Sequence, residues 1–231
     1  MIRVLLLADT HLGLGEHHFA AYERALAFAR DVDLVVHGGD VFYRSQVKPG
    51  LVFRAFEPLK RIADSGVPVF VVPGSHERSA IPFPLLAMHP RVYIFDRPRT
   101  FNVNVKGADV AISGFPCVRN GIRDQFPNLE NRGDIRLLML HQSVEGASVG
   151  PVNFTFRDGP DVIPRRAIPR HLHAVLAGHI HRHQVLDANA PVFYPGATEA
   201  TSRAEMGEVK GCVTLRIDDA GVHSWRFHAL E

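Results

Sequence analysis

Cysteine is scarce in this chain, and its scarcity excludes two kinds of cross-link. Cys117 and Cys212 are the only cysteines among 231 residues, and they lie far apart, outside any C-x-x-C spacing. A disulfide framework or a zinc site built from thiolates therefore does not fit the sequence. We expect both residues to be buried thiols in a reducing compartment. The chain is long enough to form a full hydrophobic core without such links.

Long apolar segments are absent as well. No run of about 18 apolar residues occurs, so the sequence contains no candidate transmembrane helix. The apolar run Ile2–Ala8 ends at Asp9 and is too short for the core of a signal peptide. These two absences predict a cytoplasmic protein without membrane contact. We expect residues 1–231 to form a single domain.

Net charge is small, but histidine is abundant. The formal charge is +2 at pH 7, which is compatible with nucleic acid binding and does not demonstrate it. The 14 histidines are an unusual supply of nitrogen ligands and of groups that titrate near neutral pH. Their positions relative to the predicted strands indicate what they can do.

Hydrophobic patterns predict an α/β fold. Short apolar, β-branched runs predict strands at Ile2–Ala8, Leu34–His37, Val67–Val72, Val92–Phe95, Val110–Phe115, Arg136–Leu140, Ala174–Ala177, Val192–Tyr194, Cys212–Ile217 and Val222–Phe227. Amphipathic patterns predict helices over Phe19–Arg30 and Leu51–Ala63, and Pro58 allows a kink or a split in the second. The early strand–helix alternation and the strand-rich last third favour two packed sheets with helices outside.

Polar motifs follow five of the predicted strands. They are D-T-H (9–11), G-G-D (38–40), G-S-H-E (74–77), H-Q-S (141–143) and G-H-I-H (178–181). A lone histidine at a strand end is more often a cap than a ligand. Because strand ends in open α/β sheets meet at one crevice, five such motifs together favour a metal site. His17 and His18 lie outside the motifs, and we expect them at an exposed helix N-terminus.

The residue types in these motifs indicate the chemistry. Two aspartates with four or five histidines make a mixed oxygen and nitrogen site, which suits manganese, iron or zinc better than calcium or magnesium alone. A carboxylate bridging two ions about 3.5–4 Å apart would let them activate water and neutralise a phosphoryl group. The motifs therefore predict hydrolysis of a phosphoester.

The ordered motifs between residues 9 and 181 resemble those of the calcineurin-like metallophosphoesterase superfamily. Within it, residues 140–157, 193–202 and 210–215 are similar to SbcD-type DNA double-strand-break repair exonucleases. The resemblance implies a four-layer αββα sandwich with a two-metal centre, with manganese the first choice and iron or zinc as alternatives. It also implies DNA as the substrate and an SbcC-type ATPase as a possible partner.

The resemblance further implies a role for each motif residue. The residues that would hold the first metal are Asp9, His11, Asp40 and His181. Asp40 would bridge to the second metal, whose other ligands would be His141 and His179, with Ser75 at the remaining ligand position. His76 would lie near the scissile phosphate, where it stabilises the transition state or protonates the leaving oxygen.

The sequence departs from the family pattern at several positions. Ser75 stands where asparagine is usual, and its shorter neutral hydroxyl is a poorer ligand, so we expect a weakened second metal position. Glu77 replaces the commoner aspartate, with an expected effect on ligand orientation only. Tyr43 stands where some of these nucleases carry a histidine, and we expect Tyr43 and Arg44 to contact substrate, with packing as the alternative. We expect no segment for DNA capping or ATPase docking, although such segments are usual after this domain.

Three functions remain open from the sequence. The leading hypothesis is a manganese-dependent phosphodiesterase that acts on DNA as an exonuclease or endonuclease. The second is a phosphodiesterase for small phosphoesters or cyclic nucleotides. The third is a non-catalytic scaffold for DNA or a partner, in which Ser75 marks a degraded metal site.

Overall fold

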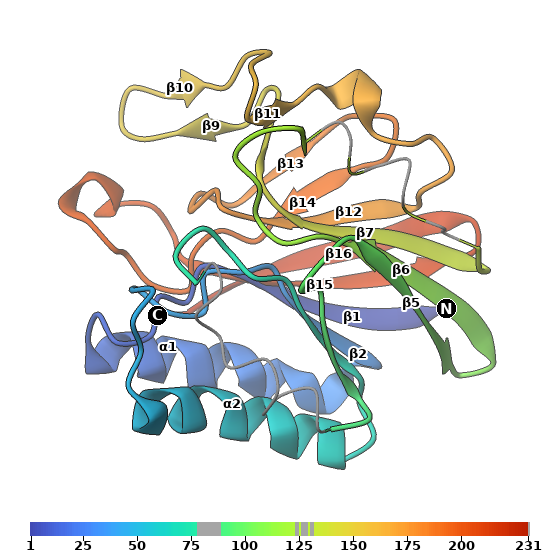
Figure 1. The fold of residues 1–231 in the computed structure, drawn as a ribbon, viewed down its shortest axis with the longest axis horizontal. Coiled ribbons are helices and arrows are strands. Elements are labelled where there is room, and N and C mark those ends of the chain that lie inside the picture. Colours follow the sequence, from blue (N-terminus) through green and yellow to red (C-terminus); the bar gives the residue numbers. More distant parts are fainter. Residues whose placement is uncertain (78–88, 123–124, 126–128, 130–131, 231) are drawn as a thin grey trace.

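Two six-stranded mixed sheets, packed face to face, form the frame of the molecule (Figure 1). The computed structural model describes residues 1–77, 89–122, 125, 129 and 132–230. Within these residues one sheet has the strand order β16-β15-β1-β2-β3-β4, and the other has the order β13-β14-β12-β7-β6-β5. The predicted α/β class with two packed sheets is confirmed by this arrangement.

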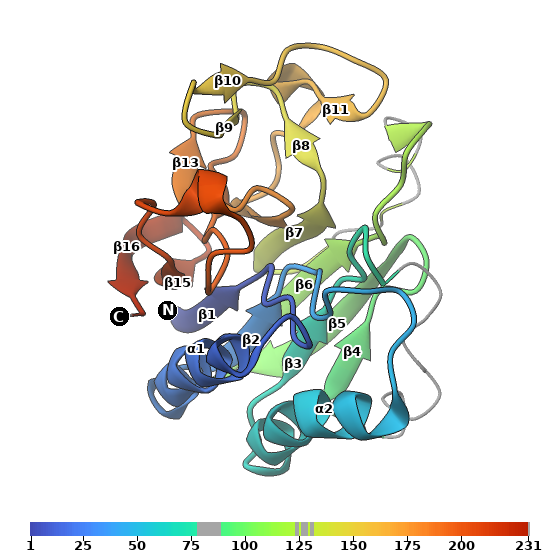
Figure 2. The ribbon, with the colours of Figure 1, turned by 90° about the vertical axis from the view of Figure 1, so that its left-hand side faces the viewer.

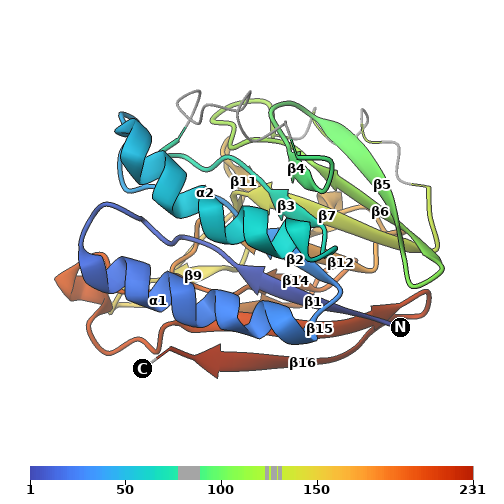
Figure 3. The same cartoon turned by 90° about the horizontal axis from the view of Figure 1, so that it is seen from below.

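The first sheet carries the early strand–helix alternation. Its strands are β1 (Ile2–Leu7), β2 (Leu34–His37), β3 (Val69–Val71), β4 (Val92–Ile94), β15 (Gly211–Asp218) and β16 (Gly221–Ala229). Strands β1 to β4 are parallel, whereas β15 and β16 join antiparallel beside β1. Helix α1 (Glu16–Ala27), its short extension η1 (Phe28–Asp31) and helix α2 (Pro49–Asp64) connect the first three strands. Figure 3 shows α1 and α2 side by side on the outer face of this sheet.

The second sheet is parallel at its centre and antiparallel at both edges. Its strands are β5 (Arg99–Val105), β6 (Ala108–Gly114), β7 (Ile135–His141), β12 (Ala174–Gly178), β13 (Gln184–Leu186) and β14 (Val192–Tyr194). Strands β6, β7, β12 and β14 pair in parallel. The edge strands β5 and β13 are antiparallel to their neighbours.

Three apolar clusters hold the layers together. Side chains alternate along β1, so that Leu5 and Leu7 pack toward the helices while Val4 and Leu6 pack between the sheets. Because both faces of this strand are covered, its sequence is continuously apolar rather than alternating. The third cluster, which includes Leu138 of β7, lies on the outer face of the second sheet.

That outer face is covered by short elements in the part of the chain that the structure describes. They are β8 (Ser143–Val144), β9 (Ser148–Val149), β10 (Phe154–Thr155), β11 (Val162–Ile163) and the 3₁₀ turn η3 (Arg165–Ala167). Figure 2 shows β8 to β11 on the side of the molecule away from α1 and α2. A further 3₁₀ turn, η4 (Arg203–Glu205), lies between β14 and β15.

Some details differ from the sequence predictions. Helix α2 runs without interruption through Pro58, so the predicted split does not occur. Cys212 is buried as expected, whereas Cys117 is only half-buried. His17 is exposed but His18, expected beside it in solvent, is fully buried. Among the described residues no helix combines the length and apolar character that a membrane span requires.

Candidate metal centre

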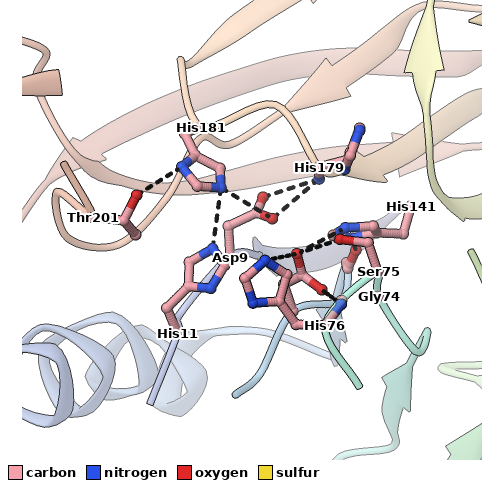
Figure 4. Close-up of polar contacts among 12 residues, drawn as sticks. Asp9, His11, Gly74, Ser75, His76, His141, His179, His181 and Thr201 are labelled. Carbon is pink, nitrogen blue, oxygen red and sulfur yellow. Dashed lines mark hydrogen bonds and ion pairs between the residues drawn. The ribbon is translucent and has the colours of Figure 1, made fainter. Parts of the chain in front are cut away.

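The polar residues of the five strand-end motifs lie together where the two sheets meet (Figure 4). Those contributed by the loops after β1, β2 and β3 are Asp9, His11, Asp40, Ser75 and His76. Those contributed by the second sheet are His141, the last residue of β7, and His179 and His181, which follow β12. The predicted convergence of parallel strand ends therefore occurs.

The backbone of these loops is held in an unusual conformation. The φ angles of Asp9, His11, Asp40 and His179 are 50°, 45°, 51° and 91°. Left-handed backbone costs a non-glycine residue on the order of 1–3 kcal/mol and persists where the surrounding structure requires it. Here neighbouring loops hold each other, since the Asp9 amide donates to the Gly39 carbonyl at 2.9 Å and the His11 amide donates to the Asp40 carbonyl at 3.1 Å.

Buried histidines outside the cluster brace the same loops. The Gly39 amide donates to Nδ1 of His37, so Nε2 of His37 carries the proton and donates to the Thr10 hydroxyl at 3.1 Å. That hydroxyl in turn donates to the Val41 carbonyl. Nδ1 of His18 donates to the Thr10 carbonyl at 3.2 Å. Thr10, between Asp9 and His11, is thus fixed through both its side chain and its carbonyl.

Asp9, His11 and His181 form a first triad of donors. Their ligand atoms all lie within 4.8 Å of one another. Nε2 of His11 is 3.0 Å from Nε2 of His181, and the latter is 3.9 Å from a carboxylate oxygen of Asp9. On its other side His181 bonds to Glu205 through Nδ1, at 3.1 Å. Because a carboxylate only accepts, Nδ1 carries the proton, and the lone pair of Nε2 in the neutral ring points at the triad.

Asp40, His141 and His179 form a second triad, also within 4.8 Å. Nδ1 of His141 donates to the Gly38 carbonyl at 2.8 Å, so in the neutral ring Nε2 presents a lone pair. That nitrogen is buried and lies 3.2 Å from Oδ2 of Asp40, without hydrogen-bond geometry. Two lone pairs facing each other in a buried place require either a proton or a cation between them.

Burial and mutual charge shift the pKa values of these groups. Burial raises the pKa of Asp9 to about 6 and lowers those of His11 and His179 to about 3 and about 4. Although burial alone would raise it, the His141 ring holds the pKa of Asp40 far below its ordinary value. Burial opposes the charged form of His141, but Asp40 outweighs it and raises the pKa of His141 to about 9.

Asp40 lies between the two triads and is held by the loop after β3. Besides the second triad, its carboxylate forms a group within 4.8 Å with His11 and His76. The His76 amide donates to Oδ1 at 2.8 Å, and the Ser75 hydroxyl donates to Oδ2 at 3.1 Å. A carboxylate in this position can bridge two cations.

Glu77 joins the loops after β2 and β3. Its carboxylate is buried and accepts the backbone amides of Asp40, Phe42 and Gly74 at 2.7–3.0 Å. This arrangement agrees with the orienting effect expected for Glu77. A side chain at Gly74 would collide with Asp40, so this position admits only glycine beside the carboxylate.

Of the two residues predicted to contact substrate, Tyr43 flanks the triads. The Tyr43 ring is 6.1 Å from the His11 ring and 5.9 Å from the His76 ring, centroid to centroid. Its carbonyl accepts a 2.6 Å hydrogen bond from Nδ1 of His76. Arg44, the next residue, is exposed. Tyr43 therefore borders the cluster through its ring as well as its backbone.

Sequence reasoning missed Glu205, which lies 24 positions beyond His181 and bonds to it. Glu205 belongs to a short turn with no hydrophobic periodicity and no motif. Lys210, a few residues later, is buried, which is unusual for lysine. Nothing local in the sequence distinguishes Glu205 from a residue of a solvated loop, whereas Lys210 begins residues 210–215, one of the stretches that carry the resemblance.

The donor sets of both triads fit divalent cations. Imidazole nitrogens and carboxylate oxygens are ligands for manganese, iron and zinc. Nε2 of His141 is buried and makes no hydrogen bond among the described residues, so its lone pair is available to a cation. His181 and His179, two residues apart, lie in different triads. The cluster can therefore accommodate two ions with Asp40 between them.

Known proteins resemble the chain in sequence and in fold. The DNA double-strand break repair protein Mre11 of Saccharolobus solfataricus is 25% identical over 198 residues, which cover 78% of this chain and 50% of the relative. The protein of the same name from Methanosarcina mazei is 29% identical over 222 residues, 88% of this chain and 34% of the relative. The chain thus spans half or less of the length of these two relatives.

A solved structure of a hypothetical protein from Thermus thermophilus has the same fold, with a TM-score of 0.59, 15% identity and coverage of 98% of both chains. The family model for calcineurin-like phosphoesterases matches residues 2–183, a span that includes every residue of the two triads. The predicted resemblance is confirmed at this level. The chain belongs to the calcineurin-like phosphoesterase family.

Proposed function

We propose that the chain is a phosphodiesterase that hydrolyses DNA with the help of two divalent metal ions. The observation that carries the proposal is the pair of donor triads with Asp40 between them. Two ions there would neutralise the charge on the phosphate and activate the attacking water. Phosphoester hydrolysis uses both effects, and the break-repair relatives favour a phosphodiester of DNA as the substrate.

Each triad supplies one metal position in this proposal. The residues assigned to the first position are Asp9, His11, Asp40 and His181. Those assigned to the second are Asp40, His141 and His179, with Ser75 as a weak donor. The Ser75 hydroxyl donates its proton to Asp40, which supports the expected weakness of this position, because an asparagine carbonyl would instead offer an oxygen to the ion.

His76 is suited to proton transfer. Because Nδ1 donates to the Tyr43 carbonyl, Nε2 is the nitrogen left for substrate. It lies 4.0 Å from Oδ2 of Asp40, and the side chain is 37% exposed, so a phosphate placed over the triads would meet it. We assign to His76 the protonation of the leaving oxygen or the stabilisation of the transition state.

Three finer points belong to the proposal. The substrate is DNA, supported by the break-repair relatives and by the Tyr43 ring at the border of the cluster, which can stack on a base. The next residue, Arg44, is exposed, and its guanidinium is of a type that binds phosphate. The metal is manganese, with iron or zinc as alternatives. An SbcC-type ATPase is the proposed partner, on the resemblance of residues 140–157 and 193–202.

Parallel hydrolysis assays test the proposed function. The purified chain with manganese is given labelled single-stranded DNA, duplex DNA ends, a bis-aryl phosphodiester and cyclic nucleotides. We expect DNA to be cut faster than the small substrates. His76→Ala should reduce the rate by about 10²–10⁴-fold, whereas His17→Ala, at an exposed histidine outside the cluster, should leave it unchanged.

The rival functions give different results in the same assays. DNA turnover no faster than that of the small diester would assign the chain to small phosphoesters. If no substrate is hydrolysed even with saturating manganese, the chain is a scaffold.

A further inference from the structure

A carboxylate stands directly behind one of the proposed metal ligands. Oε1 of Glu205, in the turn η4, is 3.1 Å from Nδ1 of His181. Nε2 of the same ring points the other way, 3.0 Å from Nε2 of His11. The imidazole of His181 thus connects Glu205 on one side with the first triad on the other.

Glu205 is itself fixed in place. Nζ of Lys210 donates to its Oε2 at 2.8 Å, and the Thr201 hydroxyl donates to Oε1 at 2.6 Å. Lys210 also donates to the backbone carbonyl of His181 at 3.0 Å, and its side chain is only 7% exposed. One buried lysine therefore holds both the carboxylate and the backbone of the histidine that this carboxylate contacts.

A second glutamate shares this network without reaching His181. Oε2 of Glu208 accepts from Lys210 at 3.0 Å. Its Oε1 accepts from Arg182 at 2.8 Å, and Arg182 in turn holds the turn between β9 and β10 through Asn153 and Gly150. Glu208 makes the same kind of ion pair with Lys210 as Glu205 does, so it provides a matched comparison.

We propose that Glu205 is a positioning residue for the first metal position, and that Lys210 keeps it in place. The carboxylate keeps the proton of the neutral His181 ring on Nδ1, so that the lone pair of Nε2 is presented toward Asp9 and His11. A carboxylate behind a ligating histidine also fixes the ring orientation and increases its strength as a donor. The inference rests on the proposed function only in taking His181 as a metal ligand.

The first test determines which ring nitrogen of His181 carries the proton in the metal-free protein. Long-range ¹H–¹⁵N NMR spectra of the metal-free protein, at a pH where the ring is neutral, show which nitrogen carries it. We expect Nδ1–H in the wild type, in Glu205→Gln and in Glu208→Ala, because the glutamine oxygen can still accept. In Glu205→Ala we expect a mixture of both tautomers. This measurement stands even if the protein hydrolyses no phosphodiester.

The second test is a titration with manganese alone, in which EPR measures the concentration of the free ion at each step. A His141→Ala background removes a ligand of the second position, so that the titration reports on the first. In this background Glu205→Ala should bind manganese about 10- to 100-fold more weakly, the usual effect of removing such a partner. Glu205→Gln should recover most of the loss, and Glu208→Ala should stay within about twofold of its parent.

Two outcomes would overturn the inference. One is unchanged His181 tautomer and manganese affinity in Glu205→Ala. The other is an equal loss of affinity in Glu205→Ala and Glu208→Ala, which would mean that the network acts on the fold as a whole. If the wild-type protein binds no manganese, the proposed function is wrong. The NMR comparison would still decide whether Glu205 controls the His181 tautomer.

Discussion

His141 carries a proton at neutral pH when no metal is bound. Asp40 raises the pKa of its buried ring to about 9, against the effect of burial. Folding therefore favours the protonated ring, and this contribution to stability is complete below pH 6.5, the ordinary pKa, and is lost as pH rises through about 9. A metal ion needs the lone pair of Nε2, so it must displace this proton.

We predict that manganese binding at pH 7.5 releases about one proton from His141. Calorimetric titrations in two buffers of different ionisation enthalpy measure this number. Asp9, with a pKa of about 6, is mostly ionised at this pH and contributes little. Affinity should rise with pH up to about 9. A binding enthalpy that is independent of the buffer would contradict the assignment of His141 as a ligand.

We expect Ser75 to limit the strength of the proposed second metal position. We predict that Ser75→Asn binds the second manganese ion at least about tenfold more tightly, or about 1.4 kcal/mol, because the amide carbonyl replaces a hydroxyl engaged with Asp40. Manganese-dependent hydrolysis should rise with it. EPR titration and rate measurements check both effects. A variant that binds two ions and remains inactive on every substrate would support the scaffold function.

At the residue scale, the sequence predicted the site residues that follow the ends of strands. It missed the residues that irregular segments place beside the site. Asp9, Asp40 and His141 could be found because each closely follows the end of an apolar run, and a strand end fixes where the following side chains lie. Glu205 could not, because its contact with His181 depends on the path of an irregular segment. His18 was predicted at the surface because periodicity does not reveal that the preceding loop folds over the helix start.

Helix α2 contains a proline where helices rarely tolerate one. Pro58 lies in the interior of Pro49–Asp64, where it cannot donate the backbone hydrogen bond of its position. We predict that Pro58→Ala raises the free energy of unfolding by about 1–3 kcal/mol, less than the full helical penalty because the unfolded chain also gains freedom. Denaturant unfolding measures the change.

Pro49 provides the matched control within the same helix. It stands in the first turn, where a missing amide costs nothing and the fixed φ angle suits the helix. Pro49→Ala should therefore leave stability unchanged or lower it slightly. Equal stabilisation by both substitutions would show that the position of Pro58 within the helix is irrelevant.

At the element scale, apolar runs predicted the strands of the first sheet and the central strands of the second, but missed the edge strands β5 and β13 of the second sheet. β2 and β14 have the bounds that the sequence predicted, because both are buried on both faces and read as unbroken apolar runs. β5 was missed because its residues, R-T-F-N-V-N-V, alternate and remain partly exposed at the sheet edge. β13 has only three residues, too few for a periodic signal.

The candidate metal centre joins the two sheets of the molecule. Asp9, His11 and Asp40 come from the first sheet, whereas His141, His179 and His181 come from the second. The order of the motifs predicted that these loops would meet, since parallel strand ends share an edge. It did not predict what covers the second sheet, because short strands and turns leave little pattern in the sequence.

A cation bound between the sheets should stabilise the whole molecule, because the unfolded chain cannot present these ligands together. At 100 times the dissociation constant, manganese should add about 2.7 kcal/mol to the free energy of unfolding. For a chain of this length that corresponds to a rise of about 5–10 °C in Tm, which a chelator should reverse. Calorimetry with and without manganese measures it.

Asp40→Asn should abolish most of this rise, because Asp40 belongs to groups with ligands from both sheets. Asp64→Asn, at an aspartate on the far end of α2 paired with Lys60, is the control and should keep the full manganese effect. Both variants are compared with the wild type at the same free manganese concentration, since the shift depends on it. An equal rise in Tm for wild type and Asp40→Asn would place the stabilising cation outside the triads. The candidate metal centre would then not be the site that binds manganese.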